Sequence, residues 1–274
     1  MKLKPTTQPT VILFICFTLF VLFSQAGCTT IPKGTPVSLA EEDWIRKAFM
    51  TKAIDDQNCF CCLDSEVAIS WDSPVWSGRV TGYLQAMAPS FLKFIGITPL
   101  GQPLLIFAMD GTSFTYVPVF EGLIYEGDIN SRTFQKHVPK GVPTKYSFFD
   151  LLGRLMPLPM HVHSINRGKN QPGYWVTFSY EGDGVRRHVL FDPEAKTFSS
   201  FLLENATEGI VLEARYERYQ AIDTCYIPAK VTLIFPGQHG IVGIELHDWL
   251  SSVALSPADF RLTLPEAFRR IPAQ

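Results

Sequence analysis

The spacing of apolar residues first follows a helical period. Ser38 followed three residues later by Glu41 forms a capping box, which is typical of a helix N-terminus. The apolar residues behind it recur three and four positions apart up to about residue 56: Trp44, Ile45, Ala48 and Phe49. This pattern predicts one amphipathic helix ahead of the rest of the fold.

From residue 66 onward the period changes to two. Val67, Ile69 and Trp71 alternate with smaller or polar residues, as in a strand with one buried face. The dipeptide Asp110-Gly111 is a strong hairpin signal between two such segments. Further strands are predicted over residues 76–87, 91–97, 102–109 and 112–120.

The second half of the chain repeats the strand pattern after one short helix. That helix is predicted over residues 147–156, and Pro157 and Pro159 end it. Strands then resume over residues 174–180, 185–191, 197–203, 210–219, 227–235 and 241–249. About ten strands, with helices only at the start and in the middle, predict an α+β fold built on a single curved antiparallel sheet.

The N-terminal segment has the pattern of an export signal. A short basic start precedes an apolar run over residues 11–23, which suits the core of a signal peptide and is too short to span a bilayer. Ala26-Gly27-Cys28 follows, with small side chains at the cleavage site and a thiol that takes the lipid. We therefore expect residues 1–27 to be a lipoprotein signal peptide and Cys28 to be acylated.

Two residues beside the predicted cleavage site bear on the assignment of a lipoprotein signal peptide. Gln25 stands where Leu is usual, and ordinary cleavage after Ala26 is the main alternative. Thr29 replaces the Asp that retains lipoproteins in the inner membrane, so in a Gram-negative cell we expect anchoring at the periplasmic face of the outer membrane. We expect a lipidated tether over residues 28–37 and a single domain over residues 38–274.

Composition and charge narrow the possible partners. Hydrophobic residues make up 46% of the chain, and 21 phenylalanines suggest either a thick core or an apolar cavity. Without residues 1–27 the formal charge is −4. Such a chain has neither the electrostatic footprint of a nucleic-acid-binding protein nor a polybasic patch for anionic lipid. Membrane attachment would therefore come from acyl chains or exposed apolar groups.

The predicted domain contains four cysteines, which in an oxidising compartment can form disulfides. They are Cys59, Cys61, Cys62 and Cys225. Adjacent cysteines seldom pair with each other, so a bond from the 59–62 cluster to Cys225 is favoured, and it would contribute about 4–5 kcal/mol in the chain-entropy model. The alternatives are unpaired thiols and metal or redox chemistry, although the spacing is unlike that of common zinc sites.

Common catalytic motifs are absent from the sequence. It has no nucleophile elbow, phosphate-binding loop, dinucleotide-binding glycine motif or metalloprotease motif. His161 and His163 could share one face of an extended segment, but no third ligand is suggested. We therefore expect no metal, no cofactor and no enzymatic activity. A hydrolase whose catalytic groups converge only in space is the alternative.

A set of short motifs appears in a recognisable order across roughly residues 40–250. They are the lipobox, the first helix, Trp76-Ser77-Gly78-Arg79, Ile97–Ile106, Asp110-Gly111, Leu152–Leu158, Ile227-Pro228-Ala229-Lys230 and the strand Ile244–Trp249. This order resembles the LolA/LolB-like family of lipoprotein localisation factors. The cysteines have no counterpart in that pattern, and residues 256–274 extend beyond it as a tail.

The resemblance implies an open, incomplete β-barrel with helices that cap an apolar cavity. Acyl chains need only an apolar concavity, so no polar motif is expected. A simple packed core would use the same residues. The candidates to line such a cavity are Trp76, Phe94, Leu104, Ile106, Phe149, Leu152, Trp175, Phe178 and Ile244.

By position, Leu100 matches a family leucine that projects from a loop and helps to deliver cargo into the membrane. The alternative is a Pro-Leu-Gly turn whose leucine folds back onto the core. The resemblance thus implies a lipid-anchored binding protein for acyl chains, lipoproteins or another apolar ligand, with lipoprotein localisation to the outer membrane as one such role. The other candidate function is an envelope scaffold whose sheet has a filled core and binds a protein partner.

Overall fold

The computed structural model describes most of the chain after the predicted tether. The chain divides into two compact units, Met1–Thr30 and Ile31–Gln274, and every described residue lies in the second, which we call the domain. The predicted signal peptide and Cys28 lie outside the described residues. The described ranges are 34–58, 62–135, 148–155, 159–169, 171–182, 184–222, 225–250 and 254–273.

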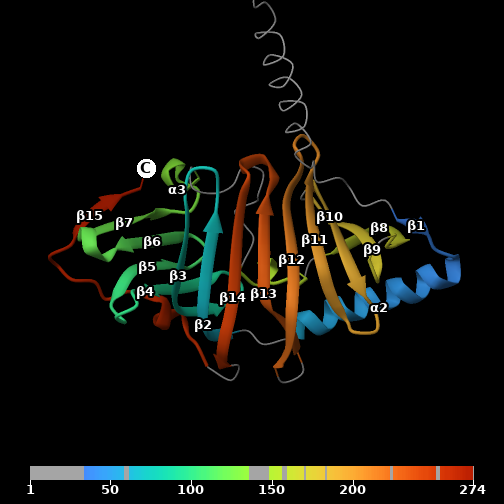
Figure 1. The fold of residues 1–274 in the computed structure, drawn as a ribbon, viewed down its shortest axis with the longest axis horizontal. Helices are drawn as coiled ribbons and strands as arrows, with labels where there is room; N and C mark the ends of the chain where they lie inside the picture. Colours follow the sequence, from blue (N-terminus) through green and yellow to red (C-terminus); the bar gives the residue numbers. More distant parts are fainter. Residues whose placement is uncertain are drawn as a thin grey trace, which may run out of the picture. The chain divides into compact units, whose positions relative to one another are not determined.

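Most strands of the domain belong to two antiparallel meanders (Figure 1). The first comprises β2 (Cys62–Asp72), β3 (Ser77–Met87), β4 (Phe91–Ile97), β5 (Pro103–Met109), β6 (Ser113–Pro118) and β7 (Leu123–Asp128). The second comprises β8 (Met160–Arg167), β9 (Tyr174–Tyr180), β10 (Val185–Asp192), β11 (Thr197–Asn205), β12 (Gly209–Ile222), β13 (Cys225–Phe235) and β14 (Gly240–Leu250).

The two meanders form one continuous sheet that does not close. β14 pairs antiparallel with β2 and joins them, with Ile244 opposite Ile69. At one edge the short β1 (Thr35–Pro36) pairs with β8, and at the other β15 (Arg269–Pro272) pairs in parallel with β7. Since β1 and β15 are not paired with each other, the predicted open, curved antiparallel sheet is confirmed.

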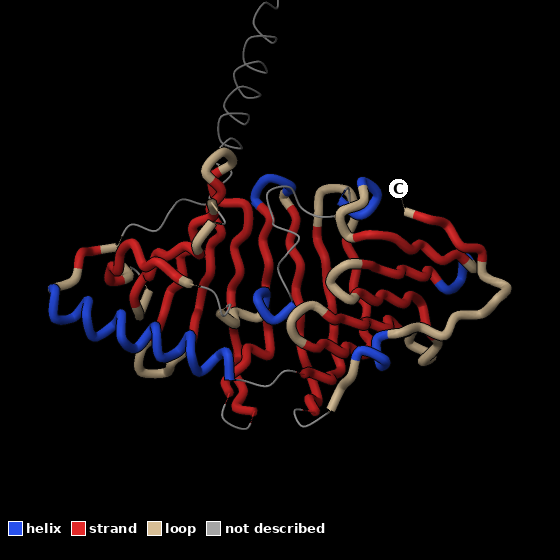
Figure 2. The backbone as a smooth tube through the Cα atoms, turned by 180° about the vertical axis from the view of Figure 1, so that it is seen from behind, coloured by secondary structure: helices blue, strands red, loops and turns tan. Residues whose placement is uncertain are grey.

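The first helix, α2 (Leu39–Asn58), packs on the second meander (Figure 2). The backbone N–H of Glu41 donates to the Ser38 Oγ at 3.3 Å, which is one half of the predicted capping box, while the Glu41 carboxylate accepts from Arg167 and Tyr174. The Phe49 ring is fully buried against three strand rings, at centroid distances of 5.4, 5.6 and 6.1 Å from those of Phe178, Phe191 and Phe198. We call the side of the sheet that α2 covers the helix face and the opposite side the outer face.

The connection from β7 to β8 links two distant parts of the sheet. Its described parts contain α3 (Arg132–Gln135) and α4 (Phe148–Leu151). The predicted helix over residues 147–156 is thus shorter than expected. The chain turns at Gly153, whose φ of +86° is a left-handed conformation that glycine adopts without a steric penalty. Phe149 and Leu152 are nonetheless buried, so this segment still contributes to the core.

The predicted hairpin at Asp110-Gly111 is present between β5 and β6. The Asp110 Oδ1 accepts hydrogen bonds from the backbone N–H groups of Thr112 at 2.9 Å and Ser113 at 2.7 Å. Partial burial raises the pKa of this carboxyl, but the hydrogen bonds outweigh it and hold the pKa at about 2. Asp110 therefore stays ionised and stabilises the turn at neutral pH.

The C-terminal tail packs against the first meander. Phe260, at the end of a short 3-10 helix, is buried against Phe91 with ring centroids 5.3 Å apart. The Lys93 ammonium donates to the backbone carbonyl of Asp259. β15 then completes one edge of the sheet. The described residues of this tail, which the family pattern left unassigned, therefore pack against the sheet and extend it.

Candidate ligand cavity

A large cavity lies against β5, β6 and β7. It has a volume of about 540 Å³, within the roughly 300–1,000 Å³ usual for small-molecule sites. We call it the aromatic cavity, because five of its eight described lining residues are aromatic. They are Phe107, Phe114, Tyr116, Pro118, Glu121, Tyr125, Thr133 and Phe134.

Strand register explains why these aromatic side chains meet. Phe107 lies opposite Tyr116, and Tyr116 lies opposite Tyr125, so the three occupy one row across β5, β6 and β7. The Tyr116 and Tyr125 rings stack with centroids 6.1 Å apart and an interplanar angle of 26°. The row continues to Phe94 on β4, which is buried in the core on the helix face. The aromatic cavity therefore lies on the helix face.

The two ends of the aromatic cavity differ. At one end, α3 places Phe134 on Phe114, with ring centroids 4.8 Å apart. At the other end, β6 finishes at Pro118 and the chain turns through a 3-10 helix, Val119–Glu121. The aromatic cavity thus runs along β6 from an end covered by α3 to an end bounded by this turn.

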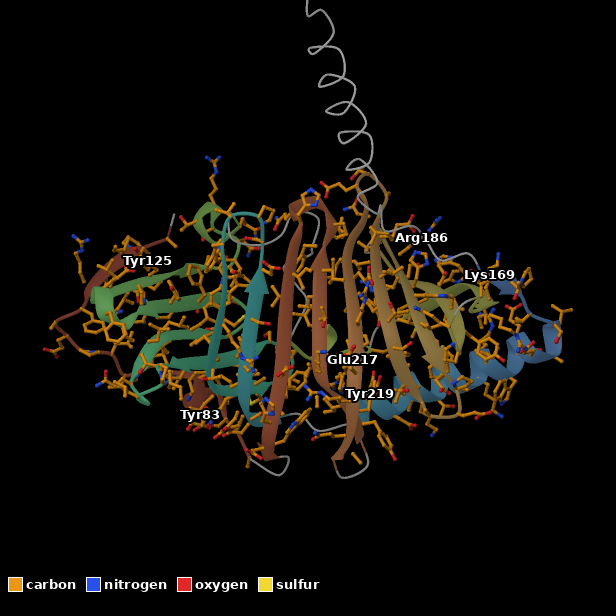
Figure 3. All side chains as sticks on the ribbon, viewed as in Figure 1. Tyr83, Tyr125, Lys169, Arg186, Glu217 and Tyr219 are labelled. Carbon is orange, nitrogen blue, oxygen red and sulfur yellow. The ribbon has the colours of Figure 1, made fainter. Side chains whose placement is uncertain are left out.

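One carboxylate, two phenols and the hydroxyl of Thr133 are the polar side-chain groups among the described lining residues. Glu121 is the one charged residue among the described lining residues, and Tyr125, labelled in Figure 3, supplies a phenol from β7. Burial raises the pKa of Tyr116, and the nearby Glu121 carboxylate and Tyr125 raise it further. Tyr116 therefore remains a neutral hydrogen-bonding group at physiological pH.

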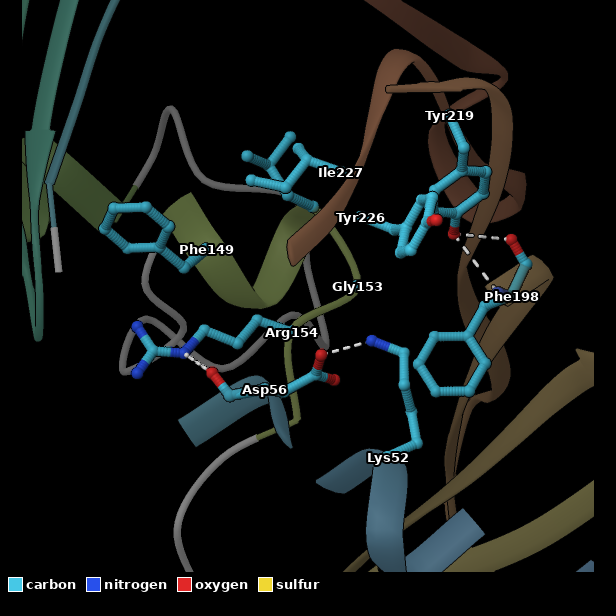
Figure 4. Close-up of a pocket in the computed structure, with 10 residues that line it drawn as sticks. Lys52, Asp56, Phe149, Gly153, Arg154, Phe198, Tyr219, Tyr226 and Ile227 are labelled. Carbon is cyan, nitrogen blue, oxygen red and sulfur yellow. Dashed lines mark hydrogen bonds and ion pairs between the residues drawn. The ribbon is translucent and has the colours of Figure 1, made fainter. Parts of the chain in front are cut away.

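The cavities described on the helix face over the second meander are much smaller. α2 and α4 leave only small cavities there, of about 30 and 10 Å³ among those described. The larger one contains a buried ion pair between Lys52 and Asp56 (Figure 4). The Arg154 Nε donates to the backbone carbonyl of Asp56 at 3.0 Å and links α2 to the segment after α4. The polar groups of Lys52, Asp56 and Arg154 thus bind one another or the backbone of the domain.

The nine residues predicted to line a cavity are dispersed over the domain. Phe149 and Leu152 line the 30 Å³ cavity, and none of the nine lines the aromatic cavity. Phe94, Phe178 and Ile244 are buried in the core. The others differ in exposure: Leu104 is 37% and Trp76 63% exposed, while Ile106 and Trp175 are partly buried.

Ile106 shows why the lining of the aromatic cavity was missed. Its neighbour Phe107 lies on the helix face, so Ile106 lies on the outer face, because successive side chains of a strand alternate. Aromatic residues at alternate positions of the predicted strands, Phe107 and then Phe114 and Tyr116, were the available signal. Tyr125 lies on β7, which was not predicted.

Leu100 lies in the turn between β4 and β5 and is 86% exposed. Hydrogen bonds between Thr98 and Gln102 close the turn, and Gly101 adopts a φ of +77°. The turn therefore holds its shape while Leu100 projects into solvent.

The predicted disulfide falls largely outside the described residues. Cys59, Cys61 and the side chain of Cys225 are not described, and Cys62 is buried at the start of β2. The disulfide stays a prediction. His161 and His163 lie with ring centroids 4.7 Å apart, and among the described residues no group of three or more potential ligands could hold a metal ion.

The domain thus combines an open antiparallel sheet with a helix over one half and an aromatic cavity on the other. No known sequence family and no curated protein matches this chain. Within the described residues no helix is both long and apolar enough to cross a membrane.

Solved structures do share the fold. A DUF1329 family protein from Desulfovibrio piger superposes with a TM-score of 0.58 at 11% identity over 78% of this chain and 96% of its own. A putative outer membrane lipoprotein-sorting protein domain from Vibrio parahaemolyticus gives 0.55 at 10% identity, over 77% and 94%. A LolA superfamily protein from Nitrosomonas europaea gives 0.54 at 10% identity, over 79% and 97%. The predicted LolA/LolB-like resemblance is confirmed at the level of the fold.

Proposed function

We propose that this protein is a lipid-anchored, non-enzymatic binding protein of the cell envelope that holds an acyl chain, a lipoprotein or another apolar ligand in the aromatic cavity. The observation that carries the proposal is the aromatic cavity itself. Three phenylalanines, one proline and the rings of two tyrosines make most of its described lining apolar, so a hydrocarbon chain entering it would leave water and stabilise the complex by about 25 cal/mol per Å² of buried apolar surface. The LolA-like fold supports the same class of function.

The end of the aromatic cavity near Pro118 suggests how a ligand enters. Leu105 on β5 pairs with Pro118, so the β4–β5 turn and the turn after β6 lie at the same end of the meander. Two strongly exposed apolar residues lie in these turns, Leu100 at 86% and Phe120 at 66%. We propose that they contact a bilayer and that the ligand passes between membrane and cavity at this end.

Acylation at Cys28 would keep the domain at that bilayer, which we propose to be the periplasmic face of the outer membrane. One acyl chain binds a membrane only marginally, whereas several together anchor it durably. The tether between Cys28 and the domain would then allow the exposed turns to reach the surface. Localisation of lipoproteins is one role that fits this arrangement.

Binding of N-phenyl-1-naphthylamine, whose fluorescence rises in apolar sites, tests the proposal. The Ile31–Gln274 unit contains the complete sheet and core, so it is suitable for this assay without the N-terminal segment. Phe107→Asn puts an amide into the aromatic cavity and should weaken binding about 10- to 100-fold, as expected for a poorly partnered buried amide.

Tyr83→Asn is the matched control. Tyr83, labelled in Figure 3, lies on the outer face and is 48% exposed, so its replacement should leave binding unchanged. Thermal melts of both variants verify that they are folded. Equal binding by wild type and Phe107→Asn would exclude the aromatic cavity as the site. Absence of binding by the folded wild type would favour the scaffold alternative.

A further inference from the structure

We propose that the aromatic cavity selects amphiphiles with a positively charged ammonium headgroup over amphiphiles with an anionic one. This inference rests on the proposed binding of an apolar ligand and adds the class of headgroup that the site accepts. It follows from three features of the aromatic cavity: the aromatic rings of its lining, the carboxylate of Glu121, and the absence of cationic side chains among its described lining residues.

Aromatic side chains can bind cations as well as apolar groups. A hydrocarbon tail alone would be held equally well by aliphatic side chains, but five of the eight described lining residues carry rings. The face of an aromatic ring is electron-rich and attracts cations, and cages of such rings bind quaternary ammonium groups. The Tyr116 and Tyr125 rings stack across neighbouring strands, so the aromatic part of the lining extends over both β6 and β7.

Glu121 is the acid best placed to receive a cationic ligand. It lines the aromatic cavity at the turn after β6, and no described residue forms an ion pair or hydrogen bond with it. Two acids on strands of the first meander and on β14 are instead neutralised by arginines, Glu126 by Arg270 and Glu245 by Arg79. Glu121 is itself solvent-exposed, and its carboxylate raises the pKa of Tyr116, which also lines the aromatic cavity.

An anionic headgroup would meet the opposite conditions. None of the described lining residues is Lys, Arg or His, so no charged donor among them could replace the water lost from a carboxylate. The negative ring faces and the Glu121 carboxylate would both oppose it. The same tail should therefore bind more weakly when its headgroup is an anion.

Displacement of N-phenyl-1-naphthylamine from the Ile31–Gln274 unit tests this preference. The competitors share a dodecyl chain and differ in headgroup: dodecyltrimethylammonium, dodecyl maltoside and dodecanoate, each below its micelle-forming concentration. The cation should compete about tenfold better than the anion, as expected for a cation–π contact combined with an unpaired carboxylate.

Two charge-neutralising variants locate the source of the preference. Glu121→Gln should reduce the advantage of the cation over the anion several-fold. Glu208→Gln removes the same charge from an exposed turn between β11 and β12 and should change nothing. Equal competition by cation and anion in the wild type, or an unaltered preference in Glu121→Gln, would overturn the inference. Failure of all three amphiphiles and of the probe itself would instead reject the proposed function.

Discussion

Replacement of Lys52 by Met should severely destabilise the domain. The Lys52 and Asp56 side chains are only 10% and 6% exposed and pair one helical turn apart on α2. The Asp56 Oδ2 also accepts from the Leu155 N–H at 3.4 Å, and the Lys52 ammonium lies 5.4 Å from the centre of the Phe198 ring. Lys52→Met keeps most of the aliphatic stem but removes the ammonium group, and with it both the charge and the hydrogen bond to Asp56. The Asp56 carboxylate is then left buried without its counter-ion.

The size of the effect follows from this burial. Removing one partner of a buried ion pair lowers the stability by about 3–5 kcal/mol, whereas replacing both partners by apolar residues leaves the stability nearly unchanged. At roughly 2–4 °C per kcal/mol for a domain of this size, Tm should fall by roughly 6–20 °C. The double variant Lys52→Met with Asp56→Leu should recover most of that loss.

Urea denaturation and thermal melts of the Ile31–Gln274 unit measure these differences. The exposed pair between Lys196 and Asp55, with side chains 55% and 51% exposed, is the control. Lys196→Met should cost less than about 1 kcal/mol because solvent screens that pair. If Lys52→Met costs no more than Lys196→Met, or if the double variant is as unstable as the single one, the account of the buried pair is refuted.

The loss of stability caused by Lys52→Met should also depend on pH. Burial raises the pKa of Asp56 above its usual value of 3.8, although Lys52 and the Leu155 N–H partly lower it. Asp56 therefore stays protonated to higher pH in the folded state than in the unfolded state. As pH rises through that interval, the ionisation of Asp56 lowers the stability of the domain. Without Lys52 the folded pKa rises further. The destabilisation by Lys52→Met should thus be smaller near pH 4 than at pH 7.

Three further predictions concern the membrane and the cysteines. Leu100→Glu should change the stability by under about 0.5 kcal/mol but reduce association of the domain with liposomes, and a large drop in Tm would instead place Leu100 in the core. Cys28→Ser should release the protein from the membrane fraction or leave an uncleaved precursor, whereas a wild-type mass with an unacylated N-terminus at Gly27 would refute lipidation. Cys225 should be oxidised, and alkylation of all four domain cysteines under denaturing, non-reducing conditions would show otherwise.

Sequence patterns predicted the strongly periodic elements of the fold. The capping box at Ser38 marked the start of α2, and Asp110-Gly111 marked the β5–β6 hairpin. β8 was missed because it alternates His161 and His163 with other residues and lacks a dominant apolar face. β7, with the sequence LIYEGD, is short and carries an acid next to Tyr125.

The position of the aromatic cavity could not be predicted from local pattern. Ile106 and Phe107 are adjacent in one apolar strand, and only the register with β6 and β7 decides which of them faces the helix side. Whether that side is filled depends on where α2 and α4 pack. Both lie over the second meander, through contacts such as Phe49 with Phe178, so the first meander keeps a cavity. These are long-range contacts that a single stretch of sequence does not encode.

Mass spectrometry of ligands that co-purify with the Ile31–Gln274 unit tests the central claim most directly. The domain would be expressed in the envelope of a bacterium, purified without detergent and extracted with organic solvent. We predict that an acylated or otherwise apolar amphiphile is present in wild type and in Tyr83→Asn, and is depleted in Phe107→Asn. Recovery of no apolar ligand from folded wild type, or of equal amounts from all three proteins, would contradict the assignment of the aromatic cavity as a binding site.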